Sequence, residues 1–522
     1  MMLAACLWTA LATTTPGDLE TRMPAQAAWL LHVNDPAGLL AGPHAERWAL
    51  FLTERRWWTE LGPDSQRFEA PVREMLRSAS GLWVASGQSA ESYREDWQSG
   101  LIQASPGTIA ALQASLEGEL TATIPVPGGE PILVLATGPL QHASQGDLFA
   151  WSLGDSGVPV AERLGDLLVG PGKDSPWSRE DLAVRRRGDD LELLLNLEPI
   201  IAPHLEEARQ ATGGGEMIGD ALARLRWAWI GATIDGRAAW NVHGAMPLPR
   251  TDAVQGLIAC LDPLDREAWK LVPQDAQQAL VLGMRWRPWL AWLRQVVQRW
   301  GESPSDDPLY EREFKQEVGI ELEADLFAHL APRLLFWQQP PRPAEEGRSS
   351  KEIWSLAFGV KNDEPFAASC AQMAEVYKWK AQEGCPAGLD AWKVPFLFGS
   401  YLFFTRQPGI FSASATSDSR GPVLALQTPE TSLQSLPILQ APPSADTHLL
   451  HVWNGAHHSP VMKDLLDGLS DLAGSTGTRP GAGMREWAAA FGGLVKPGAT
   501  EWFRIDAGVR QGVLEIDLIS RP

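Results

Sequence analysis

The residues best suited to chemistry form a run of histidines near the C-terminal end of the chain, "HLLHVWNGAHH" at residues 448–458. Imidazole nitrogens at this density can bind zinc or copper. On a β-strand, His448 and His451 point to opposite faces, because successive side chains alternate. His451 can therefore share an ion only with His457 or His458 across the following turn, and these three are the candidate metal ligands. We favour the alternative interpretation, a solvated turn with no metal, and we expect no cofactor.

Motifs for other chemistries are missing from the sequence. It contains no HExxH and no GxSxG. The segment "VGPGKDS" at 169–175 looks like a phosphate-binding loop, but Leu167 replaces the first glycine and Asp174 replaces the hydroxyl residue that binds magnesium. We therefore predict a protein that is not an enzyme, and a hydrolase or metal enzyme with an unrecognised site is the third-ranked alternative.

The four cysteines are Cys6, Cys260, Cys370 and Cys385, with no CxxC spacing among them. This pattern gives no metal site of the usual cysteine type. Cys370 and Cys385 could form a disulfide in an oxidising compartment, or both could be buried free thiols.

The first residues suggest a signal for subcellular location. "MMLAACLWTALATTTPGD" is apolar and has no charge before Asp18. Cleavage after Ala12 would suit a secretory signal, whereas "LAAC" resembles a lipoprotein signal in which Cys6 becomes lipidated. Both interpretations lack a basic start, so residues 1–24 are predicted to be a truncated signal peptide or a lipoprotein-like tether. We expect export to the periplasm or a membrane-anchored place in the cell envelope; a cytoplasmic protein is the alternative if this segment is not a signal remnant.

The overall composition limits the classes of partner. A net charge of -20 and a pI near 5.0 disfavour binding to nucleic acid, because phosphates would be repelled. With 44% hydrophobic and 21% charged residues, the chain can form a large globular core. The longest apolar run, residues 394–404, is shorter than the roughly 20 residues of a membrane-spanning helix. The 24 Trp residues mostly lie in strand or helix patterns, and we expect them in the core.

A short pattern of an apolar strand followed by the start of a helix recurs four times. The copies are "LLHVNDP" at 30–36, "LLLNLEP" at 193–199, "LGMRWRP" at 282–288 and "LLHVWNG" at 449–455. Proline at the end of three copies predicts the first residue of a helix. Leu30 precedes Leu193 by 163 residues and Leu282 precedes Leu449 by 167, so the four copies form two pairs with similar spacing.

Other strand signals keep the same order in both halves. A second strand begins 52 residues after the first in each half, at Leu82 and at Leu334. Each half closes with a hairpin, "WAWIGATIDGRAAWNVHGAMP" and "EWFRIDAGVRQGVLEIDLIS", and "TATIPVPGGEPILVLATG" is a further hairpin. Helices are expected in blocks at about 36–79, 89–116, 288–301, 308–330 and 363–383. The prediction is an α+β fold of two tandem pseudo-repeats, 25–250 and 251–522, each an antiparallel β-sheet with helices packed on one face.

Three segments resemble a group of exported bacterial proteins that is classed only as a domain of unknown function. They are "MPAQAAWLLHVNDPAGLLA", "PPSADTHLLHVWN" and "FKQEVGIELEADLFAHLAPRLLFW", and the resemblance that they carry extends over about half of the chain. In that group a Pro-x-Asp-Thr entry to a strand and a Gly-hydrophobic-x-x-x-x-Asp-Leu helix recur. Here the first entry is Pro24-Ala25-Gln26, and the second has one extra residue between Pro443 and Asp446. The resemblance implies an envelope location and a non-catalytic build, and it supplies no active-site residues.

Together these patterns predict a non-catalytic cell-envelope protein that acts as a scaffold or adaptor for other envelope proteins. The alternative is a carrier of a lipid or another apolar small molecule, because "AWKVPFLFGSYLFFTRQPGIFSASA" at 391–415 has more apolar side chains than one buried face needs. The sequence does not determine the oligomeric state.

Overall fold

The computed structural model describes most of the chain. The described residues are 22–24, 27–42, 45–52, 66–88, 96–126, 128–154, 158–169, 189–202, 205–210, 215–234, 240–264, 266–300, 307, 309–340, 353–383, 385, 388–395, 401–416, 432–440, 443–455 and 502–521. The fold is a mixture of helices and antiparallel sheet, as predicted. The chain divides into two compact units, of which unit 1 comprises residues 1–204, 226–247 and 462–496, and unit 2 comprises 205–225, 248–461 and 497–522.

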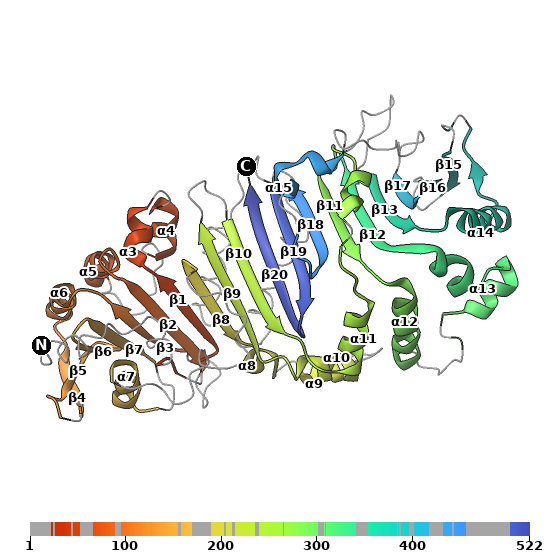
Figure 1. Ribbon diagram of the computed structural model, residues 1–522. Coiled ribbons are helices and arrows are strands. Elements are labelled where there is room, and N and C mark those ends of the chain that lie inside the picture. The colour runs from red at the N-terminus through yellow and green to blue at the C-terminus, as the bar shows by residue number, and fades with distance from the viewer. Residues whose placement is uncertain are drawn as a thin grey trace, which may run out of the picture. The chain divides into compact units, whose positions relative to one another are not determined.

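Unit 1 contains an antiparallel sheet, drawn at the red-to-yellow end of the chain in Figure 1. Its strands are β1 (Trp29–Asn34), β2 (Gly81–Gln88), β3 (Asp96–Gln103), β4 (Glu119–Ile124), β5 (Ile132–Thr137), β6 (Leu140–Gln145), β7 (Leu148–Leu153), β8 (Leu191–Asn196), β9 (Trp227–Ile234) and β10 (Trp240–Pro247). The pairings give the order β4-β5-β6-β7-β3-β2-β1-β8-β9-β10. The predicted hairpins β4–β5 and β9–β10 are both confirmed.

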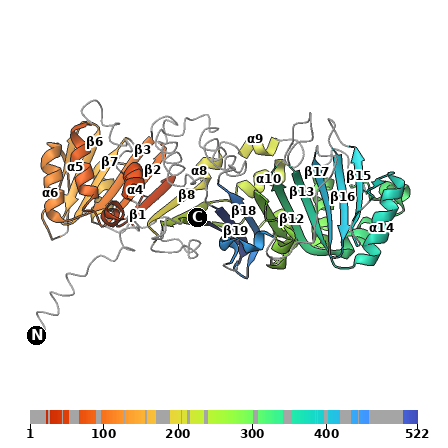
Figure 2. The same cartoon turned by 90° about the horizontal axis from the view of Figure 1, so that it is seen from above.

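Short helices accompany this sheet. They are α3 (Pro36–Ala41), α4 (Ala45–Leu52), α5 (Gln66–Leu76), α6 (Pro106–Leu116), α7 (Val160–Leu168) and α8 (Leu197–Ile201). Ser105 caps α6 by accepting a hydrogen bond from the Thr108 N–H at 3.2 Å, directly before a proline in the first turn. Helix α5 packs against α6, which also contacts β7 (Figure 2). The segment predicted as one helical block at 89–116 therefore contains strand β3, and only its second part is helical.

Unit 2 contains further antiparallel strands. Its strands are β11 (Gln278–Gly283), β12 (Leu330–Gln339), β13 (Ile353–Val360), β14 (Lys380–Ala381), β15 (Asp390–Pro395), β16 (Tyr401–Gln407), β17 (Ile410–Thr416), β18 (Thr447–Asn454), β19 (Trp502–Arg510) and β20 (Val513–Arg521). The pairings give the order β14-β15-β16-β17-β13-β12-β11-β18-β19-β20. The predicted C-terminal hairpin is β19–β20.

The helices of unit 2 are α9 (Leu205–Gln210), α10 (Gly215–Leu222), α11 (Asp252–Cys260), α12 (Trp286–Trp300), α13 (Glu311–Val318), α14 (Asp363–Val376) and α15 (Pro437–Gln440). Three segments are 3₁₀-helices, η5 (Arg266–Leu271), η7 (Phe327–His329) and η10 (Leu433–Ser435), and one is a π-helix, η6 (Leu322–Leu326). Helix α12 begins at Trp286 and α8 at Leu197, so Pro288 and Pro199 lie in the first turn but are not the first helical residue. A proline is tolerated there because the first N–H groups of a helix have no partner within it.

Two hydrophobic clusters lie on opposite faces of the unit 2 sheet. One packs Phe358 and Phe411 against residues of α12 and α14. The other packs their strand neighbours Ala357 and Ile410 against residues of η5 and η10, with Trp337 fully buried among them. Neighbouring residues of a strand point to opposite faces, so both faces are covered in part. The prediction that helices pack on one face is therefore wrong for unit 2.

Candidate functional site

One face of the unit 2 sheet carries apolar side chains that remain partly exposed. We call it the aromatic face and define it by six residues, Leu280, Phe336, Trp354, Leu356, Leu402 and Phe404. The strand registers place these residues on the same side of β11, β12, β13 and β16. None of the six is charged, so the surface is suited to bind apolar groups.

Alternation along β13 explains why these side chains are on the surface. Ser355 and Ala357 are buried, whereas Trp354 and Leu356 between and beside them are only half-buried. Ser355 shares a 2.8 Å hydrogen bond with Ser414 on β17, which satisfies both hydroxyl groups on the buried face. Ile353, Ser355 and Ala357 thus face the buried side, and Trp354, Leu356 and Phe358 face the aromatic side.

One end of this side of the sheet is covered by helices. The ring of Phe358 lies 5.4 Å from that of Trp286 on α12, and the ring of Phe411 lies 5.5 Å from that of Phe366 on α14. Trp379, which follows α14, stacks on Phe404 with a centroid distance of 4.2 Å. The covered end positions the aromatic face, because aromatic pairs and helix packing restrict how these strands can move.

A second aromatic pair lies toward the other end. Phe336 and Trp354 pair with a centroid distance of 5.3 Å, and both rings are partly exposed. Leu356 and Leu402 extend the same partly exposed strip. A surface of this kind can bury the acyl chain of a lipid or the apolar side of a protein segment.

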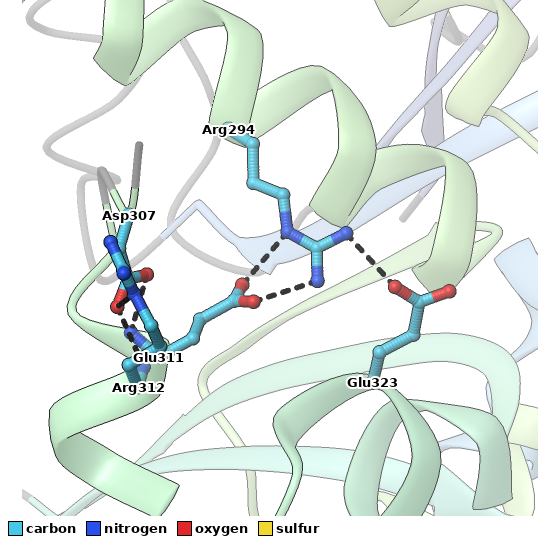
Figure 3. Close-up of polar contacts among 5 residues, drawn as sticks. All are labelled: Arg294, Asp307, Glu311, Arg312 and Glu323. Atoms are coloured by element: carbon cyan, nitrogen blue, oxygen red, sulfur yellow. Dashed lines mark hydrogen bonds and ion pairs between the residues drawn. The ribbon is translucent and has the colours of Figure 1, made fainter. Parts of the chain in front are cut away.

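An arginine holds three helical segments together at the covered end (Figure 3). Arg294 on α12 donates two hydrogen bonds to Glu311 on α13 and one to Glu323 on η6, each 2.9 Å long. The hydrogen bonds to Glu311 raise the pKa of Arg294, followed by the effect of Glu323 and opposed by burial.

A carboxylate holds the start of α13 in place beside this junction. Asp307 accepts hydrogen bonds from the backbone N–H groups of Glu311 at 2.8 Å and Arg312 at 2.6 Å (Figure 3). These two bonds, the Arg312 bond first, lower the pKa of Asp307. The contact satisfies N–H groups that have no partner within the helix and fixes the position from which Glu311 reaches Arg294.

His451, one of the three candidate metal ligands, lies in the interior of unit 2. Its side chain is on β18, pairs in register with Leu280, and stacks on Trp453 with a centroid distance of 4.9 Å. Burial lowers the pKa of His451 to about 4, so the ring is neutral at pH 7. The other two candidates, His457 and His458, lie outside the described residues. Within the described part of the chain, no group of three or more metal-ligating side chains is found.

The cysteines that the structure describes are free thiols. Cys370 is fully buried in α14, and burial raises its pKa to about 12. Cys385 is half-buried, and its Sγ donates to the Gln382 carbonyl oxygen at 3.5 Å. Cys260 is buried at the end of α11. The suggested disulfide between Cys370 and Cys385 is therefore absent, and Cys6, the candidate lipidation site, lies outside the described residues.

Unit 2 contains a buried ion pair that the sequence patterns did not predict. Arg504 on β19 is 1% exposed and donates to both carboxylate oxygens of Asp506, at 2.7 and 2.6 Å. It also donates to the Ile438 carbonyl oxygen of α15 at 3.0 Å. Burial raises the pKa of Asp506, partly offset by Arg504. The sequence pattern that could have revealed this pair is an Arg and an Asp two residues apart on a strand, a spacing that places both side chains on one face.

A second buried polar pair lies in unit 1. His32 on β1 and Glu192 on β8 are opposite each other in register, with 3.8 Å between His32 Nδ1 and a Glu192 carboxylate oxygen. The imidazole also stacks on Trp83 with a centroid distance of 4.7 Å. Both side chains are buried, so the pair joins neighbouring strands within the core and does not form a surface site.

The comparisons with known proteins add little. No family model matches the chain, and no curated protein matches it. Among solved structures, crystal form IV of TP0453 is similar with a TM-score of 0.28 and 12% identity, covering 48% of this chain and 86% of that chain. Crystal form III of TP0453 gives a TM-score of 0.27 and 11% identity over 49% of this chain and 90% of that chain. A likeness at this level carries no argument about the protein's fold or function.

Among the described helices, none combines the length and the apolar character needed to cross a membrane.

Proposed function

We propose that units 1 and 2 are two copies of one ancestral α+β sheet, produced by internal duplication. The support is the order of the strands within each unit. Each pairing in unit 1, such as β3–β7 or β1–β8, has a counterpart in unit 2 with both strand numbers raised by ten, here β13–β17 and β11–β18. Ten strands in one non-sequential order are hard to obtain twice by chance.

Side chains at equivalent places in the two sheets support the same proposal. Ser99 on β3 shares a 3.1 Å hydrogen bond with Ser152 on β7, and Ser355 on β13 shares a 2.8 Å bond with Ser414 on β17. All four hydroxyls are buried. The hairpins that lead into β7 and β17 also match, since each is a Gln followed by two turn residues, an aliphatic residue and a Phe.

We propose that the protein is a non-catalytic scaffold or adaptor of the cell envelope, with the aromatic face of unit 2 as its contact surface for a protein partner. The observation that carries this proposal is the partly exposed, uncharged strip of Phe336, Trp354 and Leu356 on that face. Aromatic residues are enriched where proteins bind one another. The envelope location is supported by the apolar N-terminal sequence.

Photo-crosslinking in the native envelope tests this proposal. A photo-reactive residue replaces Trp354 in the full chain, and the control variant carries it at Leu257, an exposed residue of α11 that is 43% exposed. We expect one protein adduct that forms at position 354 and not at position 257. Equal labelling at positions 354 and 257 would show that the aromatic face is not the contact surface. Turnover of generic ester, phosphate or glycoside substrates by the purified chain would overturn the non-catalytic part.

The second candidate function is a carrier of a lipid or similar apolar molecule. It is favoured by the apolar side chains of Phe336, Leu356 and Leu402, which share one side of the sheet and are partly exposed. Native mass spectrometry of gently purified protein would then detect one lipid per chain. Leu356→Glu should abolish the bound mass, because it places a carboxylate against an apolar ligand, whereas Leu257→Glu should preserve it. If the mass spectrum shows no bound lipid and photo-crosslinking still yields the protein adduct at Trp354, the scaffold is favoured over the carrier.

A further inference from the structure

A row of apolar side chains crosses the strands of unit 2 at a right angle. Each member is opposite the next on the neighbouring strand, and all five are half-buried. Opposite residues of adjacent antiparallel strands have their side chains on the same face, so the row is one continuous surface. Neighbouring strands lie about 4.8 Å apart, so a row over five strands is about 19 Å long. We call this the apolar row and define it as Leu280, Phe336, Leu356, Ala413 and Phe404.

One end of the apolar row carries a polar side chain. His451 on β18 is opposite Leu280 and therefore continues the row by one strand. The residue is 6% exposed, and its ring nitrogens have no hydrogen-bond partner among the described residues. A neutral imidazole has one N–H donor and one acceptor nitrogen. Because buried polar groups are normally paired, this end of the row is suited to a ligand that brings its own hydrogen-bonding group.

A second polar side chain lies beside this end. Gln338 is two residues from Phe336 on β12, so both side chains are on one face of the strand. Gln338 is 7% exposed, and its Oε1 accepts a hydrogen bond from Gln278 Nε2 at 2.6 Å. That contact leaves the N–H groups of the Gln338 amide without a partner within the described part of the chain. Gln338 and His451 lie on either side of Leu280, about 10 Å apart across the strands and about 7 Å along them, so both can reach one ligand.

The side chains around the apolar row carry almost no charge. A second register row runs beside it and is also uncharged, and its members are Trp453, Gln278, Gln338, Trp354, Ala415 and Leu402. Arg406, two residues from Phe404 on β16, lies at the far end from His451, and its Nε donates to the Asp390 carboxylate at 2.9 Å. A charged head group beside His451 would lose its hydration without gaining a counter-ion. The row therefore favours an uncharged ligand.

Aromatic side chains close the other end of the row. The ring of Trp379 stacks on that of Phe404 with a centroid distance of 4.2 Å. Trp392 is opposite Phe404 on β15, and its ring lies 6.0 Å from that of Trp379. These rings lie where the row would continue past β16. Two acyl chains end to end make the bilayer core of about 30 Å, so one chain is about 15 Å long and fits between His451 and this aromatic end.

We propose that the apolar row binds the acyl chain of one uncharged lipid, whose ester and hydroxyl oxygens are bound by Gln338 and His451. The inference rests on the carrier function, the second candidate above, and it names the ligand class as a single-chain ester with a hydroxylated head, such as a monoacylglycerol. Gln338 donates to the ester carbonyl oxygen, and His451 shares a hydrogen bond with a hydroxyl group of the head. The half-buried side chains of the row become buried against the acyl chain.

The test is equilibrium dialysis of the full chain against monoacylglycerols of increasing length, from octanoyl to eicosanoyl, each below its micelle concentration. Affinity should rise roughly four-fold with each added methylene until the chain reaches the aromatic end, and should then level off. Ala413→Trp places a large ring within the row, so the levelling should begin at a shorter chain, and Ala413→Leu should shift it less. Leu257→Trp, at an exposed position of α11, should leave the series unchanged. The urea midpoint of each variant shows that the fold is retained.

The head group is tested with His451→Phe, which keeps a ring beside Trp453 but removes the imidazole nitrogens. We expect a loss of monoacylglycerol affinity of about three- to ten-fold at every chain length. The wild type should bind the fatty acid of equal length at least about ten-fold more weakly, because its carboxylate is charged at pH 7.

The outcomes separate this inference from the carrier function. If none of these lipids binds, both are overturned. If the fatty acid binds as tightly as the monoacylglycerol, or if the length dependence is the same in both Ala413 variants as in the wild type, the carrier function stands and the uncharged, length-limited ligand is wrong. Unchanged affinity in His451→Phe likewise overturns the assignment of the head group to His451.

Discussion

The buried pair of Arg504 and Asp506 gives the sharpest prediction about stability. The two side chains lie on the same face of β19, and Arg504 is 1% exposed. A guanidinium cannot lose its proton within a protein, whereas a carboxylate can gain one. Removing the acid therefore leaves a buried positive charge, and removing the base leaves a group that can become neutral. We expect Asp506→Leu to be much more harmful than Arg504→Met.

The expected sizes follow from the geometry. Asp506→Leu removes hydrogen bonds of 2.7 and 2.6 Å from a buried guanidinium, and breaking such a pair from one side costs about 3–5 kcal/mol. For a unit of this size that corresponds to a fall in Tm of roughly 6–20 °C. Arg504→Met should cost about 2 kcal/mol at pH 7. The double variant should lie within about 1 kcal/mol of the wild type, because well-packed apolar residues can replace a buried pair.

The pH dependence of Arg504→Met provides a further check. Burial already raises the pKa of Asp506 above the usual 3.8, and loss of Arg504 raises it further. An acid whose pKa is raised in the folded state binds its proton more tightly there. The favourable contribution of the protonated acid to the free energy of unfolding is therefore lost as the pH rises through that pKa. The deficit of Arg504→Met should therefore grow as the pH rises from about 4.

Urea unfolding followed by tryptophan fluorescence measures these differences, with the shift in midpoint as the readout. Trp453 stacks on Phe503, the strand neighbour of Arg504, and reports on this region. The reasoning is refuted if Asp506→Leu is no more destabilising than Arg504→Met at pH 7. It is equally refuted if the double variant is as unstable as Asp506→Leu alone, because the penalty would then not come from an uncompensated charge.

Three further predictions concern other parts of the chain. Burial lowers the pKa of His451 to about 4, so about 3 kcal/mol of the free energy of unfolding is present above pH 6.5 and is lost between pH 6.5 and about 4. In His451→Phe the urea midpoint should therefore change less with pH across that range, and a pH dependence equal to that of the wild type would contradict this. Gly508→Ala places a Cβ 2.2 Å from the backbone oxygen of Asp446 and should lower the free energy of unfolding by about 1–3 kcal/mol, whereas Gly107→Ala, in open space on α6, should raise it by about 0.5–1 kcal/mol. Arg294→Gln should cost only about 1 kcal/mol because the side chain is 31% exposed, yet it should speed hydrogen exchange in α13 and η6; exchange rates equal to the wild type would show that the junction does not hold those segments.

Local sequence patterns predicted the hairpins well. The β4–β5, β9–β10 and β19–β20 hairpins form from neighbouring strands with turn residues between them, so the signal and the contact lie in the same few residues. The α+β class follows from the same patterns. The helical block predicted at 89–116 was partly wrong, because Asp96–Gln103 pairs with β2 and β7. Pairing with two strands overrides a local preference that a single sequence window can detect.

The candidate site was less predictable than the fold. Histidine density made His451 a candidate metal ligand, beside the favoured interpretation of a solvated turn, and the register of β18 buries it against Trp453. Arg504 and Asp506 drew no attention because the packing of α15 over β19 is invisible in local sequence. The density of reactive residues along a chain therefore predicts a functional site poorly. Segments far away in the sequence decide which of these residues are buried, and burial decides whether they can bind or ionise.

The sequence by itself determined the composition, the alternation of the strands, the turn positions and the recurring strand-to-helix pattern, since each depends on residues close together in the chain. Only the tertiary structure decided that β3 lies beside β7, that helices cover both faces of the unit 2 sheet, and that Phe336 and Trp354 stay partly exposed. Those features depend on contacts between residues tens of positions apart. Their free energy comes from burial that exists only once the sheet is assembled.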